Sequence, residues 1–332
     1  MRPQLNYGFH LVSGYMGRLS LKHYQGSGHR FGVIIRVTPD DTNHKPIYLS
    51  QRFELPGIPS KNSSRIEIDG AFFVGEGGYQ VDWLIADRNG QTCRKHWHID
   101  AKPSRGDRGL DVSLPPGTVA PLRYEPWKGA NDDRGKPLRL SLYVHVAPLS
   151  MRRLKIHPYD QTMLLSSVRS LLERTPFTSI KLVAFNLDQQ KEIFRQDGFT
   201  AEGWERLIDS VSNLDLVTVP VMVLAKRTGH LDMIRNYFDQ ELSAEQPADA
   251  VVFLGPSSRQ SEKLHFAAGD HRPRFYYLEY KPFWARGSEF PDVISHAIHA
   301  LAGKTFHIYT PHDLSVALRE LRTVSDSVNA NP

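Results

Sequence analysis

The sequence predicts an α/β protein, in which an N-terminal antiparallel β-sandwich precedes a doubly wound, mostly parallel sheet flanked by helices. Short strand patterns of alternating polarity fill residues 1 to about 100, and strand and helix patterns alternate after Leu138. The stretch LRLSLYVHV, residues 138–146, is apolar on both faces and lies between Pro137 and Pro148. A strand of that kind suits the middle of a parallel sheet that helices cover on both sides.

The length of 332 residues exceeds one ordinary domain, so we expect two. The predicted organisation is a β-sandwich over 1–110, a linker over 111–137, an α/β domain over 138–322 and a flexible tail over 323–332. With 40% hydrophobic and 23% charged residues, the composition is that of a globular protein.

Charge and cysteine content exclude several classes of function. The formal charge of +5 is mildly basic, and no Lys/Arg block is dense enough to predict nucleic-acid binding. Cys93 is the single cysteine, which excludes an internal disulfide framework and a cysteine-rich zinc site. No stretch approaches the roughly 20 apolar residues of a membrane span. The first residues contain no continuous apolar segment of the kind found in signal peptides.

The N-terminal strands are short and separated by Gly, Pro, Asn and Asp clusters, which is typical of a small antiparallel sandwich. The turn at Asn89-Gly90 favours a tight hairpin between the last two strands. From Ala101 to Pro137 the chain is rich in Pro, Gly and charge, which predicts a linker. The predicted strands are Leu19–Tyr24, Gly32–Thr38, Ile47–Leu55, Arg65–Val74, Tyr79–Ala86 and Cys93–Ile99.

After Leu138 the alternation of strands and helices indicates a mostly parallel sheet covered on both faces. Thr200 is a suitable N-cap for the helix that follows it. Gln190–Gln196 reads as a polar partner strand in a hairpin. The other predicted strands are Ser179–Asn186, Ala250–Leu254, Arg274–Tyr280 and Thr305–Tyr309, and the predicted helices are Asp160–Glu173, 201–212, Leu231–Leu242, Asp292–Ala302 and Asp313–Leu321.

The order of these elements resembles a known family. SIKLVAFNLDQQKEIFRQ resembles the second strand and edge hairpin of a von Willebrand factor type A domain, and GKTFHIYTPHDLSVALREL resembles its last strand and helix, with Thr310 and Asp313 at the helix start. The resemblance covers Leu138 to Arg322. With the β module in front, which looks immunoglobulin-like, the chain resembles the von Willebrand type A-related proteins of acidobacteria. The resemblance implies the von Willebrand type A fold and a function in binding another protein.

The chain departs from this family at its metal site. The family holds a divalent metal through an Asp-x-Ser-x-Ser loop after the first strand, because a hard cation needs oxygen ligands. The matching loop here is Ala147-Pro148-Leu149-Ser150-Met151, with Ser150 as its one oxygen side chain. The family's second carboxylate, after the fourth strand, is replaced by Gly255-Pro256-Ser257-Ser258. We therefore predict no metal and no other cofactor.

Positive charge takes the place of those carboxylates. Three parallel strands should bring their following loops to one rim. We hypothesise that this rim binds an acidic group directly, and the alternative is a solvated edge in a basic protein. The ligand-binding candidates are Ser150, Arg152, Arg153, Lys155, Ser257, Ser258, Arg259 and Lys263, to which His157, Lys281 and Arg286 add charge.

No catalytic signature accompanies the rim. Gly255-Pro256-Ser257-Ser258 lacks the Gly-x-Ser-x-Gly pattern of a hydrolase, and no phosphate-binding glycine motif is present. His296 and His299 lie three apart on a predicted helix without the His-Glu-x-x-His zinc pattern, so a partly buried, hydrogen-bonded pair is the expectation.

The sequence thus predicts a binding protein and not an enzyme, with no catalytic residue assigned. The expected partner is a protein, by resemblance in a secreted, periplasmic or cell-envelope setting, with a cytoplasmic location as the alternative. An α/β enzyme or a small-molecule binder that uses the basic rim on an anionic ligand is the alternative function. Fold analogy alone is a weak guide to function, and the sequence leaves the partner and the oligomeric state open.

Overall fold

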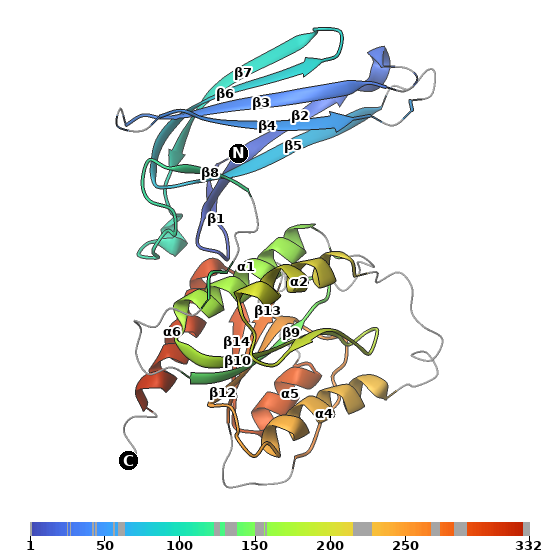
Figure 1. Ribbon diagram of the computed structural model, residues 1–332, viewed down its shortest axis with the longest axis vertical. Coiled ribbons are helices and arrows are strands. Elements are labelled where there is room, and N and C mark those ends of the chain that lie inside the picture. Colours follow the sequence, from blue (N-terminus) through green and yellow to red (C-terminus); the bar gives the residue numbers. More distant parts are fainter. Residues whose placement is uncertain are drawn as a thin grey trace. The chain divides into compact units, whose positions relative to one another are not determined.

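The computed structural model describes residues 2–24, 26, 28–41, 43, 45–55, 57–58, 64–122, 127–129, 138–149, 156, 158–214, 228–266, 273–281 and 291–327. The chain divides into two compact units, Met1–Arg123 and Tyr124–Pro332 (Figure 1). The first unit holds antiparallel strands, and the second holds a mixed, mostly parallel sheet with helices, so the predicted α/β class and its order along the chain are confirmed.

The first unit consists of two four-stranded sheets, ordered β1-β2-β5-β8 and β4-β3-β6-β7. In β3 and β6, inward side chains such as Val33 and Val81 are buried and alternate with more exposed neighbours, as expected for a sandwich with one solvated face per sheet. The strands are β1 Gln4–Leu5, β2 Leu11–Ser20, β3 Arg30–Pro39, β4 Ile47–Glu54, β5 Arg65–Val74, β6 Gly77–Asp87, β7 Thr92–Ala101 and β8 Val119–Pro121.

Two features of this unit differ from the sequence prediction. The strand predicted at Leu19–Tyr24 is wrong: β2 covers Leu11–Ser20, and a 3-10 turn follows at Leu21–His23. Gly14 weakens the strand pattern of β2 in the sequence. A Cβ at Gly14 would lie 2.1 Å from the Gly70 carbonyl oxygen of β5, so the close approach of the two backbones requires glycine. In addition, β8 pairs with β5, so residues 119–121 of the predicted linker belong to the first unit.

The second unit has one six-stranded sheet in the order β11-β10-β9-β12-β13-β14. Five strands are parallel, and β11 pairs antiparallel with β10 at the edge, as the hairpin pattern predicted. Numbered along the chain this order is 3-2-1-4-5-6, a doubly wound arrangement. The strands are β9 Leu138–His145, β10 Phe177–Asn186, β11 Lys191–Gln196, β12 Ala250–Pro256, β13 Arg274–Tyr280 and β14 Lys304–Ile308.

Helices cover both faces of this sheet (Figure 1). One face packs its aromatic residues, among them Tyr143, Phe253 and Tyr277, into a buried cluster with α4 and α5. The last helix continues to Ser327, beyond the predicted start of the tail at 323. The helices are α1 Pro158–Arg174, α2 Ala201–Ser212, α4 Gly229–Leu242, α5 Val293–Ala300 and α6 Pro311–Ser327.

Local signals explain where some helices begin. Thr200 takes the N-cap position of α2 in extended conformation, although its hydroxyl makes no capping bond there. At the start of α6, the predicted residues Thr310 and Asp313 are hydrogen-bonded to each other: the Thr310 amide and hydroxyl both donate to Asp313 Oδ2 at 2.9 Å. The Tyr309 amide donates to the same oxygen at 3.0 Å, so one carboxylate caps the turn.

Among the described residues, no helix is long and apolar enough to cross a membrane.

Candidate functional site: the carboxyl edge of the parallel sheet

The carboxyl ends of the parallel strands meet at one edge of the second unit's sheet. The strand order reverses direction between β9 and β12, which pair in parallel in the middle of the sheet. In doubly wound folds ligands bind beyond the carboxyl ends of the strands near such a reversal. Of the predicted rim residues, those after β12 and β13 can be placed here, whereas Ser150, Arg152, Arg153, Lys155, His157 and Arg286 lie outside the described residues.

The β9–β12 junction is closed by tight packing. Gly255 has φ +151° and a Cβ there would lie 2.4 Å from the His145 carbonyl oxygen, so only glycine lets β12 end beside β9. The His145 ring is buried, and its Nδ1 lies 2.9 Å from the Pro256 carbonyl oxygen. Burial lowers the pKa of His145, against the opposing charge of Asp188. A neutral His145 therefore donates from Nδ1 and acts here as a structural link.

Glu279 is the centre of a buried polar cluster next to this junction. Its carboxylate is fully buried, and it accepts a hydrogen bond from Ser257 Oγ at 2.5 Å. His307 Nδ1 lies 2.7 Å from its other oxygen, and the buried Lys281 Nζ lies 3.2 Å from that same oxygen. Burial acts to raise the pKa of Glu279, but the hydrogen bonds from His307 and Ser257 and the charge of Lys281 outweigh it, so the pKa lies below its ordinary value. The carboxylate is ionised and holds two basic side chains at the edge of the sheet.

A second buried carboxylate, Asp292, fixes the start of α5. It caps the helix by accepting the Ser295 amide at 2.8 Å, and it accepts the Ser258 amide at 2.6 Å. The Tyr277 hydroxyl lies 3.2 Å away. Burial raises the pKa of Asp292 to about 6, with the nearby negative charge of Glu279 adding to the rise. Asp292 thus ties the loop after β12 to α5, and the predicted site residue Ser258 is buried in this tie.

Beside the Glu279 cluster lies a cavity of about 550 Å³ with a basic lining. Its walls come from the loop after β12, the end of β13, α5 and β14. None of the described residues that line it is acidic, since Glu279 lies buried behind His307 and Lys281. The lining residues with basic side chains are Lys263, His265, Lys281, His296, His299 and His307.

The predicted ligand-binding residues that the structure describes do not all lie at this cavity. Lys263 is exposed and lines the cavity. Arg259 instead lies 3.4 Å from Asp188, so its charge is partly compensated. Ser257 and Ser258 serve the buried clusters. His296 and His299 both line the cavity, and among the described residues no group of three or more His, Cys, Asp or Glu could hold a metal ion.

The geometry around Ser257 does not activate a nucleophile. Its hydroxyl donates to Glu279, and His307 binds the opposite side of the same carboxylate. A histidine that served as general base would have to contact the serine itself. The cluster therefore holds Lys281 and His307 in place beside the cavity.

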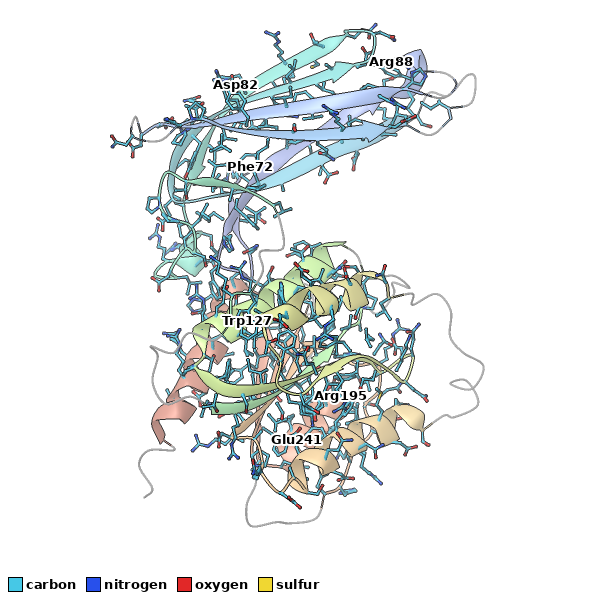
Figure 2. The ribbon with its side chains drawn as sticks, in the orientation of Figure 1. Phe72, Asp82, Arg88, Trp127, Arg195 and Glu241 are labelled. Carbon is cyan, nitrogen blue, oxygen red and sulfur yellow. The ribbon has the colours of Figure 1, made fainter. Side chains whose placement is uncertain are left out.

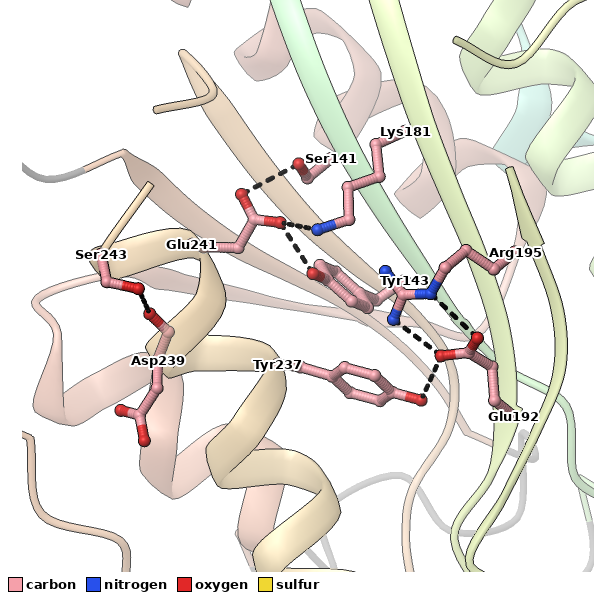
Figure 3. A network of polar contacts seen from close by, with 9 residues as sticks. All are labelled: Ser141, Tyr143, Lys181, Glu192, Arg195, Tyr237, Asp239, Glu241 and Ser243. Atoms are coloured by element: carbon pink, nitrogen blue, oxygen red, sulfur yellow. Dashed lines mark hydrogen bonds and ion pairs between the residues drawn. The ribbon is translucent and has the colours of Figure 1, made fainter. Parts of the chain in front are cut away.

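A further buried polar network lies under α4 (Figure 3). Glu241 Oε1 accepts hydrogen bonds from the Tyr143 hydroxyl at 2.7 Å and from Lys181 Nζ at 2.9 Å, and Oε2 accepts one from Ser141 at 2.9 Å. Burial and the adjacent Glu241 charge raise the pKa of Tyr143. Figure 2 labels Glu241 and Arg195 in the second unit, and Figure 3 shows Arg195 paired with Glu192 next to this network. Both carboxylate oxygens of Glu241 accept hydrogen bonds, so the network fixes α4 to β9 and β10.

Sequence reasoning found the lysines of the cavity but missed Glu279, Asp292 and His145. An acid inside the aromatic run FYYLEY is the signal that could have revealed Glu279, because a carboxylate in a buried strand requires a paired cation. The Asp292 signal was its position just before a helical pattern.

The fold and the site define a class: a two-unit protein with an antiparallel β-sandwich and a doubly wound α/β unit whose strand-end cavity is basic. Comparison with protein families and with curated proteins finds no match for the chain.

Proposed function

We propose that the chain is a non-catalytic binding protein of the von Willebrand type A-related kind, with an immunoglobulin-like module in front. Its second unit would recognise an acidic group of a partner protein without a metal ion. The antiparallel hairpin of β10 and β11 at the edge of the sheet supports this assignment, since the sequence resemblance includes it. By that resemblance the partner is expected in a secreted, periplasmic or cell-envelope setting.

The observation that carries the proposal is the basic cavity. Two lysines and four histidines converge on it from four separate segments, and no acidic residue lines it among those described. Glu279 compensates Lys281 and His307, whereas no described carboxylate forms an ion pair with Lys263. An anion in the cavity would therefore be attracted by Lys263 beside cations that are already held in place. Lys281 is buried and positioned by Glu279, so part of the charge is preorganised.

The ligand chemistry follows from the donors. Ammonium and imidazole N–H groups donate hydrogen bonds and attract negative charge, which matches a carboxylate or a phosphate. A side chain or a terminal carboxylate of a partner would supply this negative charge. The cations that support this binding are Lys263 and Lys281 with the histidines, whereas the arginines predicted after β9 lie outside the described residues.

The test measures binding by isothermal titration with three probes: a decapeptide that ends in two glutamates, citrate and inorganic phosphate. Lys263→Gln should weaken binding of the peptide at least fivefold. Lys191→Gln is the matched control, because Lys191 is an exposed lysine on β11 that does not line the cavity. Equal affinity of both variants and the parent chain, or no binding of any probe, would contradict the proposal.

The cavity volume of about 550 Å³ also favours a second candidate, a binder of a small anionic molecule, since small-molecule sites span about 300–1,000 Å³. Citrate or phosphate that binds more tightly than the peptide, with the same loss in Lys263→Gln, would select this alternative. Tighter binding of the peptide would select the protein partner.

A further inference from the structure

The β-sandwich of the first unit leaves the inner face of one strand uncovered. In the register of β7 with β6, Cys93 lies opposite Ile85, Lys95 opposite Trp83 and Trp97 opposite Val81. These three β7 side chains therefore point to the same side as the core residues of β6. Cys93 and Lys95 are nevertheless exposed and Trp97 is only half-buried. The facing sheet does not reach over this strand.

The facing sheet ends at β2, whose outer edge is open along part of its length. β1 pairs with β2 only at Leu11 and Val12, while β5 pairs with β2 on the other side from Leu11 to Ser20. From Tyr15 to Leu19, no other described strand pairs with β2. An open strand edge presents backbone N–H and C=O groups in the spacing that another strand requires.

Between the β2 edge and the inner face of β7 lies a groove of about 550 Å³. Its floor is apolar, formed by Ile68, Trp83 and Ile85, and consecutive residues from Gly14 to Leu19 form one wall. Arg18 and His96 at its rim are paired with Glu67 and Asp82. Lys95 is the exception, because no described carboxylate pairs with it, and none of the described lining residues is acidic.

We propose that this groove binds an extended peptide segment of a partner protein, which adds to β2 as a further strand. The backbone of the segment would pair with Tyr15–Leu19, and its alternate apolar side chains would cover Trp83 and Ile85. An acidic side chain of the segment faces Lys95. Charge complementarity selects this occupant: an apolar groove whose inward-pointing Lys95 has no partner among the described carboxylates fits a strand that is apolar on one face and carries one acid.

Protection of the edge is the competing role for Lys95, since an inward-pointing charge on an edge strand discourages unspecific pairing. The two roles predict different outcomes. A purely protective lysine leaves the groove unable to select any peptide, whereas a recognition lysine selects peptides with an acid in a fixed position.

Gly17 provides the test, because it lies on the same face of β2 as Tyr15 and Leu19, the face toward the groove. A Cβ at Gly17 would meet no atom closer than the Ile68 carbonyl oxygen at 3.8 Å, so a side chain fits without strain. Gly17→Phe should fill the groove. Gly32→Phe is the matched control, since Gly32 lies in β3, where a Cβ would meet nothing within 4 Å, and it does not line the groove.

The experiment selects random decapeptides displayed on phage against the full chain, and measures the affinity of the selected peptides. We expect alternating apolar residues with one acid, a loss of at least tenfold in Gly17→Phe and none in Gly32→Phe. Methylation of alternate peptide amides should abolish binding, and Lys95→Glu should select basic peptides instead. No enrichment, or peptides that bind Gly17→Phe as well as the parent chain, would overturn the proposal. Because the groove and the cavity lie in different units, a failure here leaves the test of the basic cavity unaffected.

Discussion

Replacing Glu279 by Gln tests the buried cluster at the edge of the parallel sheet. Glu279 is fully buried, and Lys281 Nζ lies 3.2 Å from its carboxylate. At an effective dielectric constant of about 20, two unit charges at that distance attract by about 5 kcal/mol. Part of this attraction is offset by the desolvation of the carboxylate, so we expect Glu279→Gln to lower the free energy of unfolding by about 3 kcal/mol.

The same substitution should have the opposite effect on anion binding. The carboxylate compensates Lys281, which lines the basic cavity. Without that compensation, citrate should bind the variant more tightly than the parent chain. Glu279→Gln with Lys281→Met should recover most of the lost stability, because no charge is left buried without a partner, and the gain in affinity should disappear.

Urea denaturation and isothermal titration with citrate measure the two effects. The pKa of Glu279 lies below its ordinary value of 4.5, so its contribution to stability is present above about pH 4.5 and is lost as the pH falls through the lowered pKa. The stability difference between parent chain and Glu279→Gln should shrink accordingly in acid. An unchanged free energy of unfolding, or weaker citrate binding in Glu279→Gln, would refute the reasoning.

Three further substitutions test other parts of the structure. The pKa of Asp292 is about 6, against an ordinary 3.8, so its contribution to stability is complete below about pH 4 and is lost as the pH rises through 6. The stability of the parent chain relative to Asp292→Asn should therefore fall by about 3 kcal/mol from pH 4 to pH 7. A stability difference that does not change with pH would contradict the burial of Asp292. Glu241→Ala should cost about 3 kcal/mol by urea denaturation, because it leaves Lys181 and two hydroxyls without their acceptor, whereas the exposed Asp239→Ala on the same helix should change stability by less than about 0.5 kcal/mol. Gly75→Ala would place a Cβ 1.9 Å from the Pro115 carbonyl oxygen and should cost at least about 2 kcal/mol, and a loss no larger than that of Gly32→Ala would show that the segment yields easily.

Much of the fold could be predicted because local pattern and tertiary environment agree. The run AVVFL is buried along its whole length in the middle of the sheet, and the arrangement of Thr310 and Asp313 starts α6 as expected. Where they disagree, prediction failed. The sequence predicted a strand only from Leu19, whereas β2 begins at Leu11. Glycine weakens a strand pattern, yet Gly14 is required by the approach of the β5 backbone.

The site was harder to predict, because its residues come from separate segments. Lys263 and Lys281 follow different strands, and their convergence with His296 depends on α5 packing beside β13 and β14. The pairing of Glu279 with His307 arises from the register of β13 with β14, in which the two residues are direct partners. No spacing in the sequence encodes that register, so the sequence related His296 to His299 on a helix and did not relate His307 to Glu279.

The most direct test of anion recognition is a crystal structure of the full chain grown with selenate, whose anomalous scattering identifies the bound ion. We predict selenate in the basic cavity, in contact with Lys263 or Lys281. The account is contradicted by a structure in which selenate occupies other sites while the cavity holds none.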